Sequence, residues 1–144
     1  IEVIQKALDK YHFSSSEPFE ILCTGGGLDI AGLTGLIIGG AIYKMPIVLD
    51  GVISMVAALT AERIAPGVKD YLVPSHISRE PAAKKIMEEL NLRPVIDADM
   101  ALGEGTGAVM MISLLKMTYK VLQNSYSFKD AGVQQYVRYK GENQ

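Results

Sequence analysis

The chain has 144 residues, enough to bury a core without disulfides or a structural metal, and its 49% hydrophobic and 21% charged content is typical of a globular protein. A formal net charge of −2 provides no basic field, which argues against nucleic acid as a partner.

The one cysteine and the apolar segments indicate where the protein resides. Cys23 cannot form an internal disulfide, and its apolar neighbours indicate a buried thiol in a reducing compartment, so we expect a cytoplasmic location. The charge-free run 30–43 is too short and too glycine-rich for a bilayer, and we expect no membrane partner. Because the chain opens at Ile1 inside a helical pattern, with no signal-peptide pattern, we expect a fragment.

The first elements in chain order are a helix, a strand and a second helix. Apolar residues at helical spacing predict a lead-in helix over 1–11, which ends at the break over 14–18. Residues 19–23 predict a strand that runs into the glycines at 25–27. The segment 28–43 has the length and apolarity of a buried helix, which completes one strand-turn-helix unit.

The same unit is expected three more times. The predicted strands are 46–49, 71–73 and 94–97, and the helices that follow them are 53–64, one starting near 80, and 106–124. Such alternation predicts an α/β fold, a partly complete doubly wound parallel sheet of about four strand-helix units with helices on both faces. We expect 1–144 to be a single α/β fragment. Ligands bind such sheets beyond the carboxyl ends of the strands, so the four turns are the candidate site.

The first turn is glycine-rich. Gly25, Gly26 and Gly27 would let backbone amides approach an anion or a ribose at the head of a helix. Their spacing is not G-x-G-x-x-G, so a dinucleotide fingerprint is absent. A purely structural turn is an equal alternative, in which Asp29 is an acid in the first turn of its helix.

The second and third turns carry polar side chains. Asp50 follows a strand and would either hold a ligand hydroxyl, orient a neighbour, or cap the helix after it. Ser75, His76 and Ser78 suit a phosphate, although Ser78 also fits a plain helix cap. Since His76 has no partner at metal-ligand spacing, a hydrogen-bonded structural histidine is the better interpretation.

The fourth turn contains the carboxylates. Asp97 and Asp99 could bind a divalent ion, but with no third oxygen ligand nearby they are better interpreted as solvated strand-end acids, and we expect no metal or cofactor. The stretch 103–107 is different, because three glycines around Glu104 carry an entropic cost that a plain cap does not require. A partly desolvated carboxylate there would make a good general base, and a glycine-rich phosphate turn is an equal alternative.

Five motifs occur in one order over nearly the whole chain. They are GGLDIAG at 26–32, VLDG at 48–51, SHISREP at 75–81, LGEGTGA at 102–108 and FKDAGV at 128–133. In order and spacing the sequence resembles the nicotinate-nucleotide:dimethylbenzimidazole phosphoribosyltransferase family, which makes α-ribazole phosphate for the lower ligand of cobalamin.

This resemblance implies a fold and an activity. Family members are dimers with a doubly wound α/β domain and a smaller helical part, to which 107–144 would contribute. They transfer the phosphoribosyl group of nicotinate mononucleotide to 5,6-dimethylbenzimidazole, releasing nicotinate, with no metal or cofactor. Since family chains are much longer, we expect this fragment to be inactive alone.

The resemblance also implies residue roles. Glu104 matches the general base, and Ser78 with the backbone at Arg79 matches the phosphate-holding turn. The remaining substrate-binding residues expected are Gly26, Gly27, Asp50, Gly103, Gly105, Thr106 and Gly107. Position 79 usually carries a small residue, so Arg79 either strengthens phosphate binding or points to solvent. The alternatives are a non-catalytic nucleotide- or phosphate-binding domain and a purely structural α/β domain.

Overall fold

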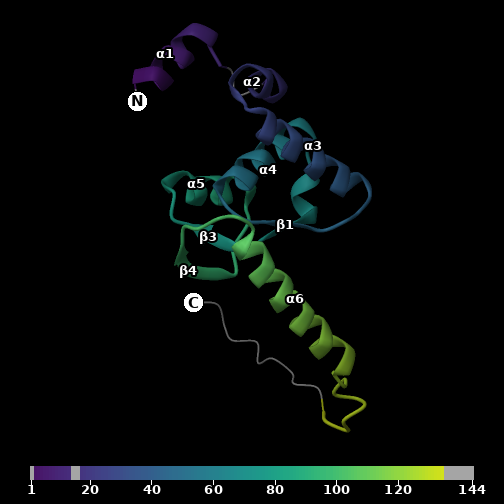
Figure 1. Cartoon of the computed structure of the whole chain (residues 1–144). Helices are drawn as coiled ribbons and strands as arrows, with labels where there is room; N and C mark the ends of the chain where they lie inside the picture. Colours follow the sequence, from purple (N-terminus) through teal and green to yellow (C-terminus); the bar gives the residue numbers. More distant parts are fainter. Residues whose placement is uncertain (1, 14–16, 135–144) are drawn as a thin grey trace, which may run out of the picture. The chain divides into compact units, whose positions relative to one another are not determined.

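The computed structural model describes residues 2–13 and 17–134 (Figure 1). The chain divides into two compact units, Ile1–Ile112 and Ser113–Gln144. Of the residues that the structure describes, the first unit contains all the strands and the candidate site. In the second, the carboxyl-terminal part of a long helix is followed by turns in which Ser127 and Asp130 bond to each other. Residues 135–144, the end of the expected helical tail, lie outside the described residues.

Helices alternate with short strands, as the sequence predicts for most of the chain. The elements are α1 (Glu2–Tyr11), α2 (Pro18–Gly25), α3 (Leu28–Ile42), β1 (Ile47–Leu49), α4 (Val52–Ile64), the 3-10 helix η1 (Val68–Tyr71), β2 (Leu72–Pro74), β3 (His76–Ser78), α5 (Pro81–Leu90), β4 (Ile96–Met100) and α6 (Thr106–Asn124). The helices predicted over 53–64 and 106–124 are confirmed. The chain is therefore of mixed α/β class with short parallel strands.

The strands form two parallel ladders that share one segment. β1 pairs with β2, and β3 pairs with β4, both in parallel. Ser75 lies between β2 and β3, where its N–H donates to the Leu49 carbonyl at 3.1 Å and its carbonyl accepts from the Ile96 N–H at 3.0 Å. The segment 72–78 is thus hydrogen-bonded to β1 in its first half and to β4 in its second.

One predicted strand is wrong. Residues 19–23 lie inside α2, where Pro18 occupies the first turn and Glu20 adds a carboxylate near the positive end of the helix. A five-residue run with four apolar side chains has no periodicity that separates strand from helix. The first expected strand-turn-helix unit is therefore a pair of helices. Cys23 is exposed on α2, so the buried thiol expected there is also wrong.

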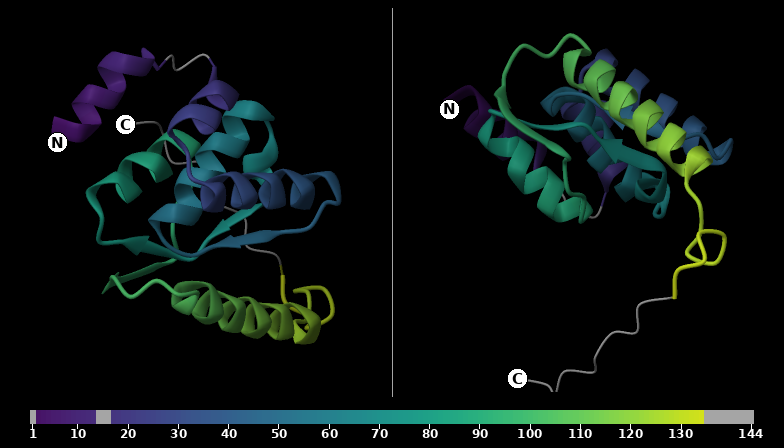
Figure 2. Two further views of the ribbon diagram at one scale, coloured as in Figure 1. Left: turned by 45° about the horizontal axis from the view of Figure 1, so that its top comes forward. Right: turned by 90° about the horizontal axis from the view of Figure 1, so that it is seen from below.

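The core of the first unit is built around α4. Met55, Ala57, Ala58 and Ala61 have no exposed surface, and the small alanines allow α3, beside α4 in Figure 2, to pack closely. From α5 the core takes Ala83, Ile86, Met87 and Leu90, at the spacing of one helix face. The core fixes the positions of the strands, whose carboxyl ends lead into the loops described below.

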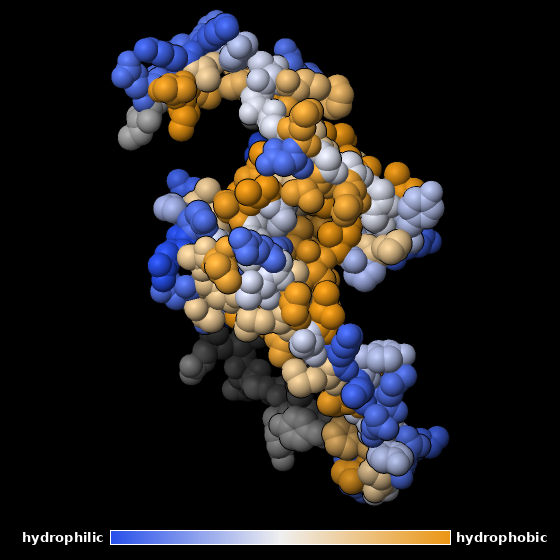
Figure 3. Space-filling model, in the orientation of Figure 1, coloured by the Kyte–Doolittle hydropathy of each residue, from blue (hydrophilic) through white to orange (hydrophobic). Residues whose placement is uncertain are grey.

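The helix α3 is far more exposed than its composition predicts. Only Thr34 and Ile37 are buried, whereas Leu28 is 93% and Leu36 61% exposed. Apolar side chains gather over this part of the surface in Figure 3. The helix predicted over 28–43 is confirmed as Leu28–Ile42, but the expectation that it is buried is wrong for this chain, because its contacts with α4, η1 and α2 cover only part of its surface. Within the described residues, no helix is both long and apolar enough to cross a bilayer.

Candidate active site

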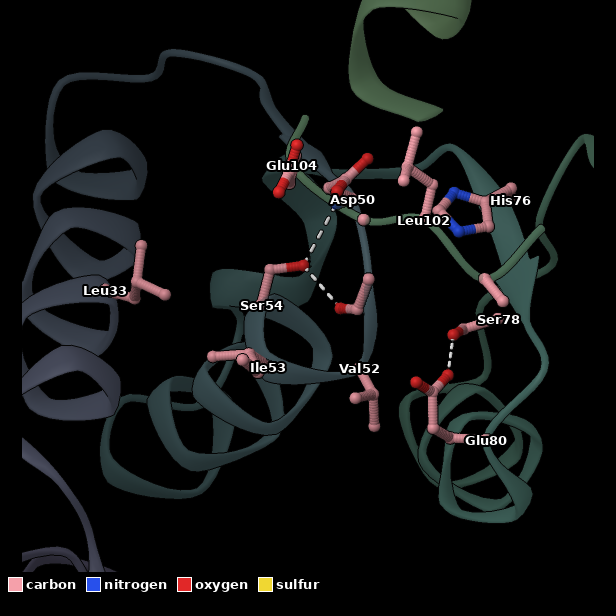
Figure 4. A pocket seen from close by; sticks show the side chains of 13 residues that line it. Leu33, Asp50, Val52, Ile53, Ser54, His76, Ser78, Glu80, Leu102 and Glu104 are labelled. Atoms are coloured by element: carbon pink, nitrogen blue, oxygen red, sulfur yellow. Dashed lines mark hydrogen bonds between the residues drawn. The ribbon is translucent and has the colours of Figure 1, made fainter. Parts of the chain in front are cut away.

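A hollow of about 450 Å³ opens where the carboxyl ends of β1, β3 and β4 meet (Figure 4). Its polar lining consists of Asp50, Ser54, His76, Ser78, Glu80 and Glu104. These residues come from three turns of the predicted set and from the first turn of α4. The expectation that the polar turns after successive strands converge at one edge is confirmed for these three.

Asp50 holds the loop that carries Glu104. Its carboxylate accepts one hydrogen bond from the Gly105 N–H and one from the Ala108 N–H, both at 3.0 Å. These amides lie at the start of α6, where a negative charge is stabilised by the helix dipole. Asp50 thus caps α6 and orients a neighbouring loop, whereas α4 begins at Gly51 without a side-chain cap.

Replacing Asp50 with asparagine should therefore loosen the start of α6. An asparagine oxygen can accept one of the two N–H bonds, while its NH₂ group faces the other donor. We expect the free energy of unfolding to fall by about 1–2 kcal/mol, measured by urea denaturation. Glu88→Gln, on the exposed face of α5, is the matched control and should change stability little. Equal stability of the Asp50 variant and the control would contradict the capping role.

The loop around Glu104 is left-handed over three consecutive residues. Gly103, Glu104 and Gly105 have φ angles of 70°, 54° and 80°. Glycine adopts this conformation freely, but for Glu104 it costs about 1–2 kcal/mol. Glu104 is exposed on the wall of the hollow, and its carboxylate makes no hydrogen bond to any residue that the structure describes. Since Asp50 caps α6, Glu104 is left available to a ligand.

His76 is a buried neighbour of this loop. The residue is 2% exposed, and its Nδ1 lies 3.0 Å from the Ser75 Oγ. The first turn of α6 packs directly on the ring, because a Cβ added to Gly107 would lie 2.0 Å from Nδ1. The prediction of a hydrogen-bonded structural histidine is confirmed for this nitrogen.

Ser78 and Glu80 form a pair at the rim of the hollow. The Ser78 hydroxyl donates to the Glu80 carboxylate. This bond is the largest of the causes that lower the pKa of Glu80 below its ordinary value. Helix α5 has Glu80 at its N-cap position without a side-chain cap bond, so the plain cap considered for Ser78 is not formed.

The Arg79 side chain pairs with Asp99 and does not line the hollow. Its Nε donates to Asp99 Oδ1 at 2.9 Å, and its Nη2 lies 2.5 Å from Asp99 Oδ2. The Arg79 side chain is 61% exposed and the Asp99 side chain is 76% exposed. Asp99 is therefore an ion-paired strand-end acid. In the described part of the chain, no three acidic, histidine or cysteine side chains are grouped to bind a metal ion.

The Arg79 pair predicts a pH-dependent contribution to stability. Arg79 lowers the pKa of Asp99, first by hydrogen bonding and then by charge attraction. A carboxylate with a lowered folded-state pKa stabilises the protein above its unfolded value, near 4, and this contribution disappears as the pH falls through the folded value. We expect wild type to exceed Asp99→Asn in stability slightly at pH 7 and to match it near pH 2, measured by urea denaturation. Asparagine tolerates the φ of 50° at this position, so a difference independent of pH would contradict the prediction.

The remaining predicted site residues lie in two places. Gly103 lines the hollow, while Gly105, Thr106 and Gly107 lie just behind it at the start of α6. Gly26 and Gly27 are at the joint between α2 and α3 and line a different, apolar hollow with Phe19 and Leu28. The structure does not bring these two glycines together with Asp50 and Glu104.

Two glycines at the α2–α3 joint, Gly25 and Gly26, also have a packing role. A Cβ on Gly25 would lie 2.9 Å from the Phe13 ring, and one on Gly26 would lie 2.6 Å from the Leu22 carbonyl oxygen. Within this chain, the structural interpretation of the turn is therefore sufficient.

Sequence reasoning missed Ser54 and considered Glu80 only as part of a helix cap. The Ser54 hydroxyl accepts from the Asp50 N–H at 3.0 Å and donates to the Gly51 carbonyl at 2.8 Å. Ser54 could have been found from the sequence, because it lies in the first turn of a helix that directly follows the end of a strand.

A family model described as a phosphoribosyltransferase matches residues 1–133. The chain belongs to this phosphoribosyltransferase family. A relative from Acetivibrio thermocellus, named nicotinate-nucleotide--dimethylbenzimidazole phosphoribosyltransferase, is 41% identical over 136 residues, which cover 94% of this chain and 39% of the relative. A relative of the same name from Prosthecochloris aestuarii is 43% identical over 133 residues, or 92% of this chain and 38% of the relative.

A solved member of the phosphoribosyltransferase family has the same fold. The crystal structure of the Thermus thermophilus nicotinate-nucleotide-dimethylbenzimidazole phosphoribosyltransferase matches with a TM-score of 0.78 and 39% identity, covering 86% of this chain and 37% of that chain. The chain thus spans about two fifths of the length of the relatives that it matches.

Proposed function

We propose that these residues form part of an enzyme that transfers the phosphoribosyl group of nicotinate mononucleotide to 5,6-dimethylbenzimidazole, with Glu104 as the general base. The products are α-ribazole 5′-phosphate and nicotinate. The observation that carries the proposal is the Glu104 carboxylate, which stands on the wall of the hollow with the α6 amides already capped by Asp50.

The chemistry requires little more than alignment and one base. A ring nitrogen of the benzimidazole forms a bond to the anomeric carbon of the ribose, and the bond from that carbon to the pyridinium nitrogen breaks, leaving its electron pair on nicotinate. The proton on the other benzimidazole nitrogen passes to Glu104. Because the pyridinium is already a good leaving group, binding geometry and proton acceptance supply most of the catalysis.

The other predicted residues have substrate-binding roles in this proposal. Ser78 and the backbone at Arg79 hold the phosphate, and the loop residues Gly103, Gly105, Thr106 and Gly107 border the cleft. The two bonds from Asp50 to the start of α6 support a role in setting the position of Glu104. Gly26 and Gly27 would meet substrate only if residues beyond this chain extend the cleft toward the α2–α3 joint.

We propose that the complete enzyme is a cytoplasmic homodimer, and that it has a doubly wound α/β domain and a smaller helical part. Residues 107–144 would contribute to the helical part. The exposed apolar face of α3, with Leu28 and Leu36, supports additional chain packing there. The relatives are more than twice as long as this chain. For these reasons we propose that the segment is inactive alone.

The test is an assay of nicotinate release with and without 5,6-dimethylbenzimidazole. It requires a full-length enzyme that carries these residues, for example the Acetivibrio thermocellus relative with its matching segment replaced by this chain. Release that depends on dimethylbenzimidazole is the expected result. A folded protein that binds nicotinate mononucleotide without any such release would instead support the non-catalytic nucleotide-binding alternative.

A further inference from the structure

The segment 101–104, which carries Glu104, forms one wall of the hollow and lies outside any helix or strand. It joins the end of β4 to the start of α6. At its α6 end, the segment is fixed by Asp50, which binds two amides of the first turn of that helix. The position of Glu104 therefore also depends on what holds the other end, where β4 stops at Met100.

The strand pairing is irregular at the β4 end of the segment. The ladder of β3 and β4 contains the pairs His76–Ile96 and Ser78–Met100. From 96 to 100 β4 advances four residues, while β3 advances two from 76 to 78. Asp99 lies in this irregular stretch with a left-handed φ of 50°. Because a bulge interrupts the regular main-chain hydrogen bonds of a ladder, the end of β4 gains from a further contact with β3.

The Arg79 side chain makes that contact. Its Nε and Nη2 donate to the two carboxylate oxygens of Asp99 at 2.9 and 2.5 Å, and Nη2 also lies 3.4 Å from the Asp99 carbonyl oxygen. Two parallel N–H bonds from a planar guanidinium fix direction as well as distance. Since Arg79 directly follows β3 and Asp99 belongs to β4, the pair ties the end of one strand to the strand that leads into 101–104.

We propose that Arg79 is a positioning residue, whose guanidinium holds Asp99 and so fixes the β4 end of the segment that carries Glu104. This inference rests on the proposed function, in which Glu104 is the general base. With Asp50 at the α6 end, the segment is then held from both sides. An exposed ion pair contributes little to global stability, but a catalytic group displaced by about 1 Å can lose about 100-fold in rate. The effect of the pair should therefore appear in catalysis.

The first experiment is a double-mutant cycle in the full-length chimaera, the Acetivibrio thermocellus relative with its matching segment replaced by this chain. Arg79→Gln and Asp99→Asn should each lower kcat about 2- to 5-fold, the scale of one exposed pair, without changing the KM for nicotinate mononucleotide. The double variant should be no slower than either single variant, because both remove the same contact. Additive losses, or a KM raised by Arg79→Gln even when residue 99 is asparagine, would refute the proposal.

Two further variants separate geometry from charge. Arg79→Lys keeps the charge but loses the two-point contact, so its kcat should lie between those of wild type and Arg79→Gln. Arg63→Gln is the matched control, because it removes another exposed ion pair, that of Arg63 with Glu89 at 3.2 Å between α4 and α5. This control should keep the wild-type kcat. An Arg79→Gln variant as fast as the control would also refute the proposal.

A second measurement does not require activity. The Arg79 N–H donates to the Met100 carbonyl at 3.3 Å, and its hydrogen exchange should be about 2- to 5-fold faster in Asp99→Asn than in wild type. Unchanged exchange would show that the side-chain pair does not hold the end of β4. Nicotinate release by the unmodified chimaera reports separately on the proposed function, so either idea can fail without the other.

Discussion

Replacing Glu104 with glutamine is expected to lower dimethylbenzimidazole-dependent nicotinate release by about 10²- to 10⁴-fold, the usual contribution of a general base. Glutamine has nearly the same shape but cannot take the benzimidazole proton. The substitution should leave folding intact, because the Glu104 carboxylate has no hydrogen bond within the described residues to lose, and glutamine meets the same left-handed backbone.

The kinetic constants separate a catalytic role from a binding role. Loss of the base should lower kcat while leaving the KM for nicotinate mononucleotide within a few-fold, since the mononucleotide itself donates no proton in this reaction. Glu88→Gln, an exposed change on α5, serves as the control and should retain full turnover. If Glu104→Gln also kept its kcat, the general-base assignment would have to be abandoned.

Gly107→Ala is expected to lower the free energy of unfolding by about 1–3 kcal/mol, the usual cost of overpacking a core. The new methyl group would lie 2.0 Å from His76 Nδ1, 2.6 Å from its Cε1 and 2.9 Å from the Ser75 Oγ. His76 is buried and bonded to Ser75, so the ring cannot move aside without breaking that bond. Helix propensity alone predicts the opposite sign, because alanine favours a helix by up to about 1 kcal/mol over glycine.

Gly35→Ala in α3 is the matched control. No atom lies within 4 Å of a Cβ added there, so alanine should stabilise this chain by up to about 1 kcal/mol. The urea concentration at the midpoint of unfolding should therefore fall below that of wild type for Gly107→Ala and rise above it for Gly35→Ala. A Gly107 variant as stable as the Gly35 variant would show that α6 does not rest on His76.

Asp50 and Gly107 act on the same loop from two sides. Asp50 binds the Gly105 and Ala108 amides from the end of β1, and Gly107 allows the first turn of α6 to lie on the imidazole at the start of β3. Together they hold the strained loop of Glu104 at the edge where the strands end. A base whose position is fixed before substrate binds needs less reorganisation during the reaction.

Local sequence patterns were sufficient to predict a helix or strand where the residues of that element specify it by themselves. The β-branched run of β1, the proline at the start of α5 and the apolar spacing of α4 each predict their element because the backbone preference and the buried face are encoded within a few residues. The polar turns after β1 and β4 were recognised for the same reason. The strand predicted over 19–23 was wrong because so short a run, with four apolar residues and Glu20, fits a strand and a helix equally well, and packing against α3 and α4 decided between them.

The sequence by itself determined that the chain is α/β, that its parallel strands end in polar turns, and that Glu104 stands among glycines. Only the tertiary structure decided which helix Asp50 caps, since its partners Gly105 and Ala108 follow it by 55 and 58 residues and become neighbours through the parallel pairing of the strands. The same is true of Gly107, whose missing side chain makes room for His76. Contacts of this kind depend on which strand ends meet, and no local pattern carries that information.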